Sequence, residues 1–169
     1  MNKTRKLALS ALIAALAVVL CWIGAIVPTG SVAFVGFAGL LTAIAVVECG
    51  YAWALGQFAV ACVLGLLLVS DKMIVLIYAA LFGWYPVVKS LIDRSKLRVA
   101  AQWIIKLLIL NAVLVLGYMA ANKLLLLEDT QTLPVLLVGV IPVEVSFVFY
   151  DLVLTKLIDQ YTRRKAKKK

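Results

Sequence analysis

The chain has 169 residues, of which 65% are hydrophobic, and its mean hydropathy is +1.09. A soluble domain is about half apolar and lacks uncharged runs of about 20 residues, so these values exclude a soluble globular protein. The formal net charge is +9, but no soluble segment is long enough to fold and present a basic surface to nucleic acid. We therefore expect one integral membrane domain over residues 1–169, with no nucleic-acid partner.

The first half of the chain predicts three membrane-spanning helices. The first covers about residues 7–27, which is too long for the hydrophobic region of a signal peptide, and it ends at a turn-forming Pro28-Thr29-Gly30-Ser31. The stretch that follows, 32–69, would form a helix of about 57 Å, whereas one crossing is about 30 Å. We expect it to fold back at Glu48-Cys49-Gly50, which gives spans over about 32–47 and 51–69.

The second half predicts three more spans. Ser70-Asp71-Lys72 precedes a fourth span over about 73–92, in which we expect Pro86 to kink the helix. The fifth span covers about 99–121 and the sixth about 134–158, before a basic tail over 159–169. The expected fold class is therefore an all-α membrane protein with six transmembrane helices.

The basic residues predict the orientation of these helices. They cluster before the first span, from the end of the fourth span to the start of the fifth, and after the sixth, whereas the loops on the opposite side contribute only Lys72 and Lys123. Because clusters of Lys and Arg stay cytoplasmic, we expect a multi-pass protein of the cell membrane with both termini cytoplasmic. The C-terminal tail also predicts contact with anionic lipid. The clusters are Lys3, Arg5 and Lys6; Lys89, Arg94, Lys96 and Arg98; and Arg163, Arg164, Lys165, Lys167, Lys168 and Lys169.

Several kinds of chemistry are missing from the sequence. The chain has no histidine and no G-x-x-x-x-G-K-[ST] motif, which removes His-dependent catalysis and nucleotide binding by a P-loop. Glu144 and Asp151 lie about 10 Å apart along one helix face, too far to share a proton. The three cysteines lack C-x-x-C spacing and indicate no disulfide. We therefore expect no enzymatic activity, no cofactor and no metal site.

Four ionisable residues lie inside or at the edge of the predicted spans: Glu48, Lys106, Glu144 and Asp151. A charge at the bilayer centre costs about 2.5–3.5 kcal/mol, so such groups usually face a partner, a cavity or a ligand. Lys106 and Asp151 occur at similar depths on the antiparallel fifth and sixth spans, which predicts an intramembrane ion pair. The alternative is that Lys106 extends to the inner headgroups.

Glu144 has no basic residue at its own depth on the neighbouring span. Three interpretations stay open: a protonated side chain, a hydrogen bond to Asn111 between helices, or a place in a ligand site. Two helical stripes of polar and aromatic residues also favour either core packing or a binding surface. These stripes are Asn111, Val115, Tyr118 and Asn122 on the fifth span, and Tyr78, Phe82, Tyr85 and Lys89 on the fourth.

The first span carries small residues at helical spacing. Ala11 and Ala15 form an A-x-x-x-A motif, and Ala8 and Ala14 widen the smooth face. Such faces let helix backbones approach closely in a membrane, either within one protein or between partners. The pairs Gly39/Ala43, Ala52/Gly56 and Ala61/Gly65 repeat the pattern and are consistent with internal packing.

The size, the six spans and the opening Lys3-Thr4-Arg5-Lys6-Leu7-Ala8-Leu9-Ser10-Ala11 make the chain resemble the substrate-binding S components of energy-coupling factor (ECF) vitamin transporters. The resemblance implies that a transmembrane coupling subunit, driven by two ATPase subunits, docks on Ala8, Ala11 and Ala15. It also implies that a vitamin or related small molecule binds in the outer half. By position, the implied substrate-binding residues are Thr29, Ser31, Tyr78, Asn111, Tyr118, Asn122 and Glu144.

Two other functions remain as alternatives. One is a membrane scaffold that resembles the cell-shape protein MreD in length and number of spans. The other is a lipid-interacting membrane protein without a transport role.

Overall fold

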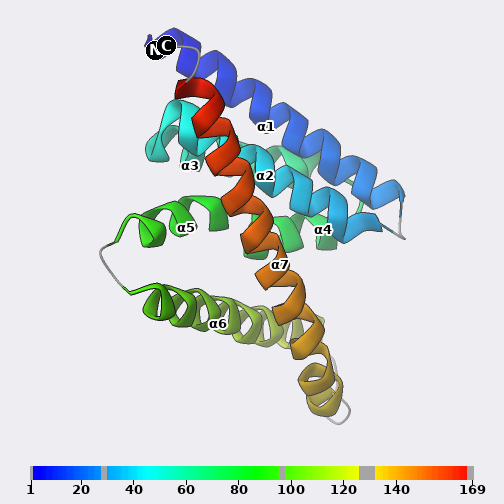
Figure 1. Cartoon of the computed structure of the whole chain (residues 1–169). Helices are drawn as coiled ribbons and strands as arrows, with labels where there is room; N and C mark the ends of the chain where they lie inside the picture. The colour runs from blue at the N-terminus through cyan, green and yellow to red at the C-terminus, as the bar shows by residue number, and fades with distance from the viewer. Residues whose placement is uncertain (1, 28–29, 96–97, 126–131, 167–169) are drawn as a thin grey trace. The chain divides into compact units, whose positions relative to one another are not determined.

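The structure is a computed structural model that describes residues 2–27, 30–95, 98–125 and 132–166 (Figure 1). Side chains at 117–142 and 164–166 lie outside the description. The described residues are helical and contain no strand. The elements are α1 (Lys3–Ile26), α2 (Ser31–Cys49), α3 (Tyr51–Leu68), α4 (Lys72–Ile77), the π-helical segment η2 (Tyr78–Phe82), α5 (Tyr85–Asp93), α6 (Val99–Leu125) and α7 (Thr132–Ala166).

Among the described residues, five segments are long and apolar enough to cross a membrane. The chain is therefore a multi-pass membrane protein. The sixth predicted span falls on α7, where residues 134–142 have no described side chains, so six spans and the orientation of the termini remain predictions. The five segments are Lys3–Ile26, Ser31–Cys49, Tyr51–Leu68, Lys72–Asp93 and Val99–Leu116.

The chain forms two compact units. Unit 1 contains Met1–Ser95 and Leu157–Lys169, and therefore holds α1 to α5 and the last part of α7. Unit 2 contains Lys96–Lys156, which covers α6 and most of α7. The single membrane domain expected from the sequence stays a prediction.

Small side chains fill the core of unit 1. In Figure 1, α1 runs beside α2 and α3, and the residues that it buries include Ala14, Ala17 and Cys21. On α2, Ala38 and Ala43 are fully buried. Because lipid tails are as apolar as the helices, helices associate in membranes through close packing, and small residues permit it.

A single glycine joins α2 to α3. Gly50 has φ +93°, in the left-handed region that favours glycine, and it lies between Cys49 at the end of α2 and Tyr51 at the start of α3. The predicted break at Glu48-Cys49-Gly50 is confirmed.

The fourth predicted span is interrupted. The chain passes from α4 into η2, bends at Gly83 and Trp84, and begins α5 with Pro86 in its first turn. The ring of a proline clashes with the carbonyl four residues earlier, here Phe82, so a straight helix cannot pass through this point. The widened turn is closed by the Gly83 N–H, which donates to the Tyr78 carbonyl at 2.8 Å. The irregularity expected at Pro86 therefore occurs before it, over Tyr78–Trp84.

Candidate functional site

The four small-residue pairs of the sequence fall into two classes. Two pairs are buried within unit 1, where they allow close packing of helices. The other two are exposed or partly line an open groove, and the structure gives them no such internal role. The buried pairs are Gly39/Ala43 and Ala61/Gly65, and the exposed pairs are Ala11/Ala15 and Ala52/Gly56.

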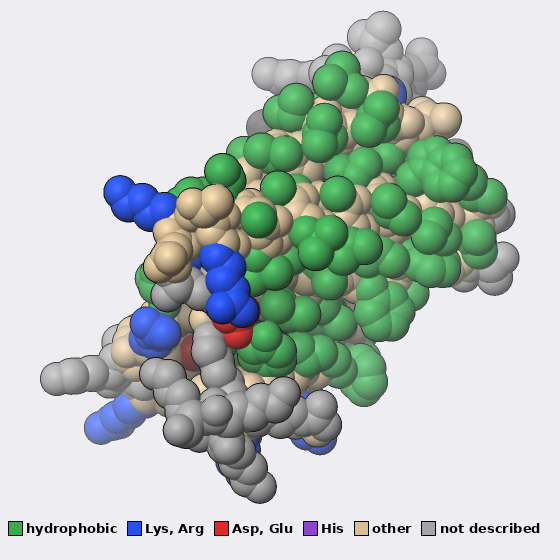
Figure 2. Space-filling view, turned by 90° about the horizontal axis from the view of Figure 1, so that it is seen from above, with side chains coloured by type: hydrophobic (Ala, Val, Ile, Leu, Met, Phe, Trp, Pro, Cys, Tyr) green, Lys and Arg blue, Asp and Glu red, His purple; other side chains and the backbone are tan. Residues whose placement is uncertain are grey.

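The exposed face of α1 contains all three predicted docking residues. Ala8, Ala11 and Ala15 are exposed, whereas Ala14 and Ala17 face the core. On the face that Figure 2 presents, hydrophobic side chains form a broad surface. We call the exposed set Ala8, Ala11 and Ala15 the α1 small face.

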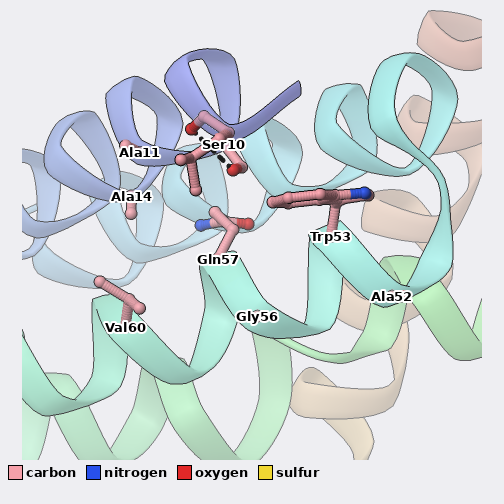
Figure 3. A pocket seen from close by; sticks show the side chains of 9 residues that line it. Ser10, Ala11, Ala14, Ala52, Trp53, Gly56, Gln57 and Val60 are labelled. Carbon is pink, nitrogen blue, oxygen red and sulfur yellow. Dashed lines mark hydrogen bonds between the residues drawn. The ribbon is translucent and has the colours of Figure 1, made fainter. Parts of the chain in front are cut away.

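A groove of about 450 Å³ lies between α1 and α3, next to the α1 small face (Figure 3). A cavity of this volume is within the range of small-molecule sites. A Cβ built on Gly56 would meet no atom within 4 Å, so the open space there is not needed for packing. The lining includes Leu7, Ser10, Ala14, Trp53, Gln57 and Val60, together with Ala11, Ala52 and Gly56.

Gln57 is the buried polar residue of this groove. Its side chain projects from α3 toward α1, on the side of the helix that carries Trp53 and Val60 (Figure 3), and the residue is 3% exposed. Within the described residues, neither its amide nitrogen nor its amide oxygen makes a hydrogen bond of good geometry, although the Tyr78 hydroxyl is close enough for a weak one. A buried amide without a partner costs about 1–3 kcal/mol, so Gln57 is a polar group of this groove that a bound molecule could satisfy.

Tyr78, a predicted substrate residue, lies in the core of unit 1. Its hydroxyl is 3.3 Å from the Thr42 hydroxyl, and its ring is 6.0 Å from the ring of Phe58. Tyr78 is 1% exposed and Thr42 is fully buried. This geometry serves to fix η2 against α2 and α3.

A second polar cluster gathers where α2 ends and α3 begins. The Tyr161 hydroxyl, from the part of α7 within unit 1, donates to Glu48 Oε1 at 3.0 Å. Burial, the hydrogen bond and the Glu48 charge, in that order, raise the pKa of Tyr161 above its ordinary value. Glu48, an ionisable residue that the sequence singled out, thus has a hydroxyl partner.

Basic residues of α5 extend this cluster. Lys89 is 1% exposed, and its Nζ lies 3.1 Å from Asp93 Oδ2 one turn later. The Arg94 guanidinium stacks over the Tyr51 ring at 5.4 Å, and the Tyr51 hydroxyl is 3.3 Å from the Ser90 hydroxyl. A positive charge that is buried in this way normally needs a carboxylate, which Asp93 supplies.

Unit 2 contains two polar contacts between α6 and α7. Lys106 Nζ donates to Asp151 Oδ2 at 3.3 Å, with both side chains buried, and the ammonium also lies 5.4 Å from the Trp103 ring centroid. Asn111 Nδ2 donates to Glu144 Oε1 at 3.0 Å. These are the two helix-to-helix contacts that the sequence suggested, and together they fix the register of the two helices.

The remaining predicted substrate residues are less well defined. Ser31 begins α2 and is partly buried, and its carbonyl lies close to Gly24 of α1. Thr29 and the side chains of Tyr118 and Asn122 lie outside the described residues. Among the described members of the predicted substrate set, the structure brings together Asn111 and Glu144, while Tyr78 belongs to the other unit.

Gln57 and Trp53 were missed by the sequence analysis. Ionisable residues are the ones whose burial in a membrane costs most, whereas Gln57 is a neutral amide. One signal was available, since Gln57 is an amide in an otherwise apolar helix and directly follows the small pair Ala52/Gly56. Its burial depends on how α1 packs on α3, which the sequence does not reveal.

The comparisons with known proteins add no relative. No protein-family model, curated protein or solved structure matches this chain. Among the residues that the structure describes, no group of three His, Cys, Asp or Glu side chains is arranged to hold a metal ion.

Proposed function

We propose that this chain is the solute-binding membrane subunit of an importer of the ECF type. It docks through the α1 small face on a transmembrane coupling subunit, which is driven by two ATPase subunits. Its two termini face the cytoplasm, and it captures a vitamin or related small molecule from the outer side.

The single observation that carries the proposal is the exposure of Ala8, Ala11 and Ala15. Small residues at this spacing allow close helix contact, and within the described chain no helix covers them. A helix that faced only lipid would gain nothing from a smooth face, because lipid tails conform equally well to large side chains. The lack of a P-loop in the sequence also fits a subunit that depends on separate ATPases.

The Asn111–Glu144 pair supports the solute-binding part. It combines an amide and a carboxyl group on two apolar helices, and binding pockets typically contain a few such polar groups among apolar walls. Polar groups within a membrane segment are a functional-site hypothesis by default. We propose that Glu144 recognises a donor group on the solute.

Affinity purification from the native membrane tests the proposal. The tagged chain should copurify with a membrane coupling subunit and an ATPase pair, and native mass spectrometry should show a bound small molecule. Ala8→Trp and Ala15→Trp should abolish copurification, because a bulky side chain separates the helices. These positions are chosen because neither lines the groove.

Leu76→Trp on α4 is the matched control, since Leu76 is 47% exposed and lies on another helix. It should leave the complex intact. Recovery of cell-envelope proteins without any ATPase would refute the importer and favour the scaffold.

A further inference from the structure

We propose that the groove between α1 and α3 binds one anionic phospholipid. In this arrangement Gln57 donates to an ester carbonyl, an acyl chain lies along the apolar part of the groove, and Lys3 and Lys6 hold the phosphate. The proposal does not depend on the importer function.

Gln57 identifies the kind of group that must enter the groove. The residue is 3% exposed, and its amide makes no hydrogen bond of good geometry among the described residues. A hydrocarbon chain offers no acceptor, so lipid tails alone cannot satisfy the amide nitrogen. An ester carbonyl can, and it occurs where the polar and apolar parts of a phospholipid meet.

The depth of Gln57 agrees with that position. Gln57 lies six residues after Tyr51, the first residue of α3, which corresponds to about 9 Å along the helix axis. Trp53 lies one turn closer to the helix start and lines the same groove. Tryptophan is enriched at the membrane interface, so Gln57 lies just below the interface rather than at the bilayer centre.

Along α1, the residues change from charged to polar to apolar. Lys3 and Lys6 precede the groove, Ser10 lines it level with Gln57, and Ala14 follows in the lining. Lys3 and Lys6 share the helix face of Leu7 and Ser10, because they lie three or four residues away. Lys6 is one helical turn, about 6 Å, from Ser10. Phosphate, ester and acyl chain follow one another in the same order in a phospholipid.

The geometry favours a flexible chain over a partner helix in this groove. A helix with its side chains is about 10–12 Å wide and could only lie across the opening. The amide of Gln57 lies at the bottom, between two helices that pack directly on each other. A molecule thinner than a helix can enter the groove, and we propose that a change of the Gln57 rotamer then exposes the amide to it.

Native mass spectrometry of the purified full chain tests the proposal, after delipidation and addition of phosphatidylglycerol or phosphatidylcholine with identical acyl chains. Each chain should retain one molecule of phosphatidylglycerol, and it should bind phosphatidylcholine more weakly. Glycerol 3-phosphate, which carries the phosphate without acyl chains, should not displace the lipid. Equal retention of both lipids, or displacement by glycerol 3-phosphate, would overturn the proposal.

Four variants separate the contributions. Gly56→Leu should block the binding of both lipids, because the leucine side chain would fill the open space in front of Gly56. Ala59→Leu should leave the binding of both lipids unchanged, because Ala59 is exposed and does not line the groove. Gln57→Leu should weaken the binding of both lipids several-fold. Lys6→Gln should weaken the binding of phosphatidylglycerol alone, by about fivefold, because it removes one positive charge.

Arg5→Gln is the matched charge control for Lys6→Gln, because Arg5 lies on another side of α1. Arg5→Gln should weaken the binding of phosphatidylglycerol less than Lys6→Gln does. Lipid-free Gln57→Leu should unfold at the wild-type temperature or above, which shows that its weaker binding is not a folding defect. Wild-type lipid retention by both Gln57→Leu and Gly56→Leu would refute the site.

A photo-reactive side chain at position 56 in native membranes distinguishes the two occupants. The proposal predicts an adduct with lipid. A discrete protein adduct would show that a partner helix fills the groove and would overturn the lipid assignment.

Discussion

Lys106 and Asp151 form a buried ion pair between α6 and α7, with 3.3 Å between Lys106 Nζ and Asp151 Oδ2. Their side chains are only 5% and 2% exposed, so removal of either one leaves a buried charge without this ion-pair partner. We expect Lys106→Met or Asp151→Leu alone to destabilise the protein by about 3–5 kcal/mol. The double variant should recover most of this loss, as measured by thermal unfolding in detergent. Additive losses in the double variant would show that the two groups do not interact.

Gly83 allows the bend before α5 to pack against Phe58. A Cβ at Gly83 would overlap the Phe58 ring and lie 3.1 Å from Tyr78 Cζ. We expect Gly83→Ala to cost about 1–3 kcal/mol of unfolding free energy, as overpacking does. Adding Phe58→Ala should relieve the overlap, so that Gly83→Ala costs less in that background. An equal cost in both backgrounds would place the strain elsewhere.

Two glycines of α3 should respond differently to the same substitution. A Cβ at Gly56 meets nothing within 4 Å, whereas a Cβ at Gly65 lies 3.0 Å from Val75 Cγ1. Alanine is favoured over glycine inside a helix by about 0.5–1 kcal/mol. Gly56→Ala should therefore be neutral or stabilising, while Gly65→Ala should lower the melting temperature because Val75 is buried. The reverse order would contradict the packing of α3 on α4.

Tyr161 predicts a loss of stability at alkaline pH. Its pKa is raised in the folded protein, so the neutral hydroxyl is favoured by folding. The stabilising effect should be complete below pH 10, the ordinary pKa of tyrosine, and should disappear as pH rises through the folded-state value. We expect the difference in stability between the wild type and Tyr161→Phe to shrink over this range. A difference that grows with pH would mean that Glu48 is not the partner of a neutral phenol.

The sequence predicted most helices because the physical constraints on them are local. The apolar run 32–69 is too long for one crossing. Near its middle, Glu48-Cys49-Gly50 combines the one charged residue of the run with a glycine, so the turn was predictable. The Lys106–Asp151 contact was suggested by depth alone, since antiparallel spans bring equal depths together. The position of the bend before Pro86 was not predictable to the residue, because it depends on how η2 widens.

The candidate site was less predictable because it depends on packing. Four small-residue pairs have the same spacing in the sequence, and only the structure separates the exposed pair Ala11/Ala15 from the buried pair Ala61/Gly65. Gln57 is similar, since an amide in a span could face lipid, a neighbouring helix or a cavity. Its burial in a groove results from the approach of α1 to α3.

Photo-crosslinking from α1 in native membranes tests the docking claim most directly. A photo-reactive amino acid at position 15 lies on the α1 small face, and one at position 17 lies in the core, where Ala17 is fully buried. Position 15 should give an adduct with a membrane coupling subunit, and position 17 should give no adduct with another protein. Lipid adducts alone from position 15, or equal protein adducts from both positions, would contradict the docking function.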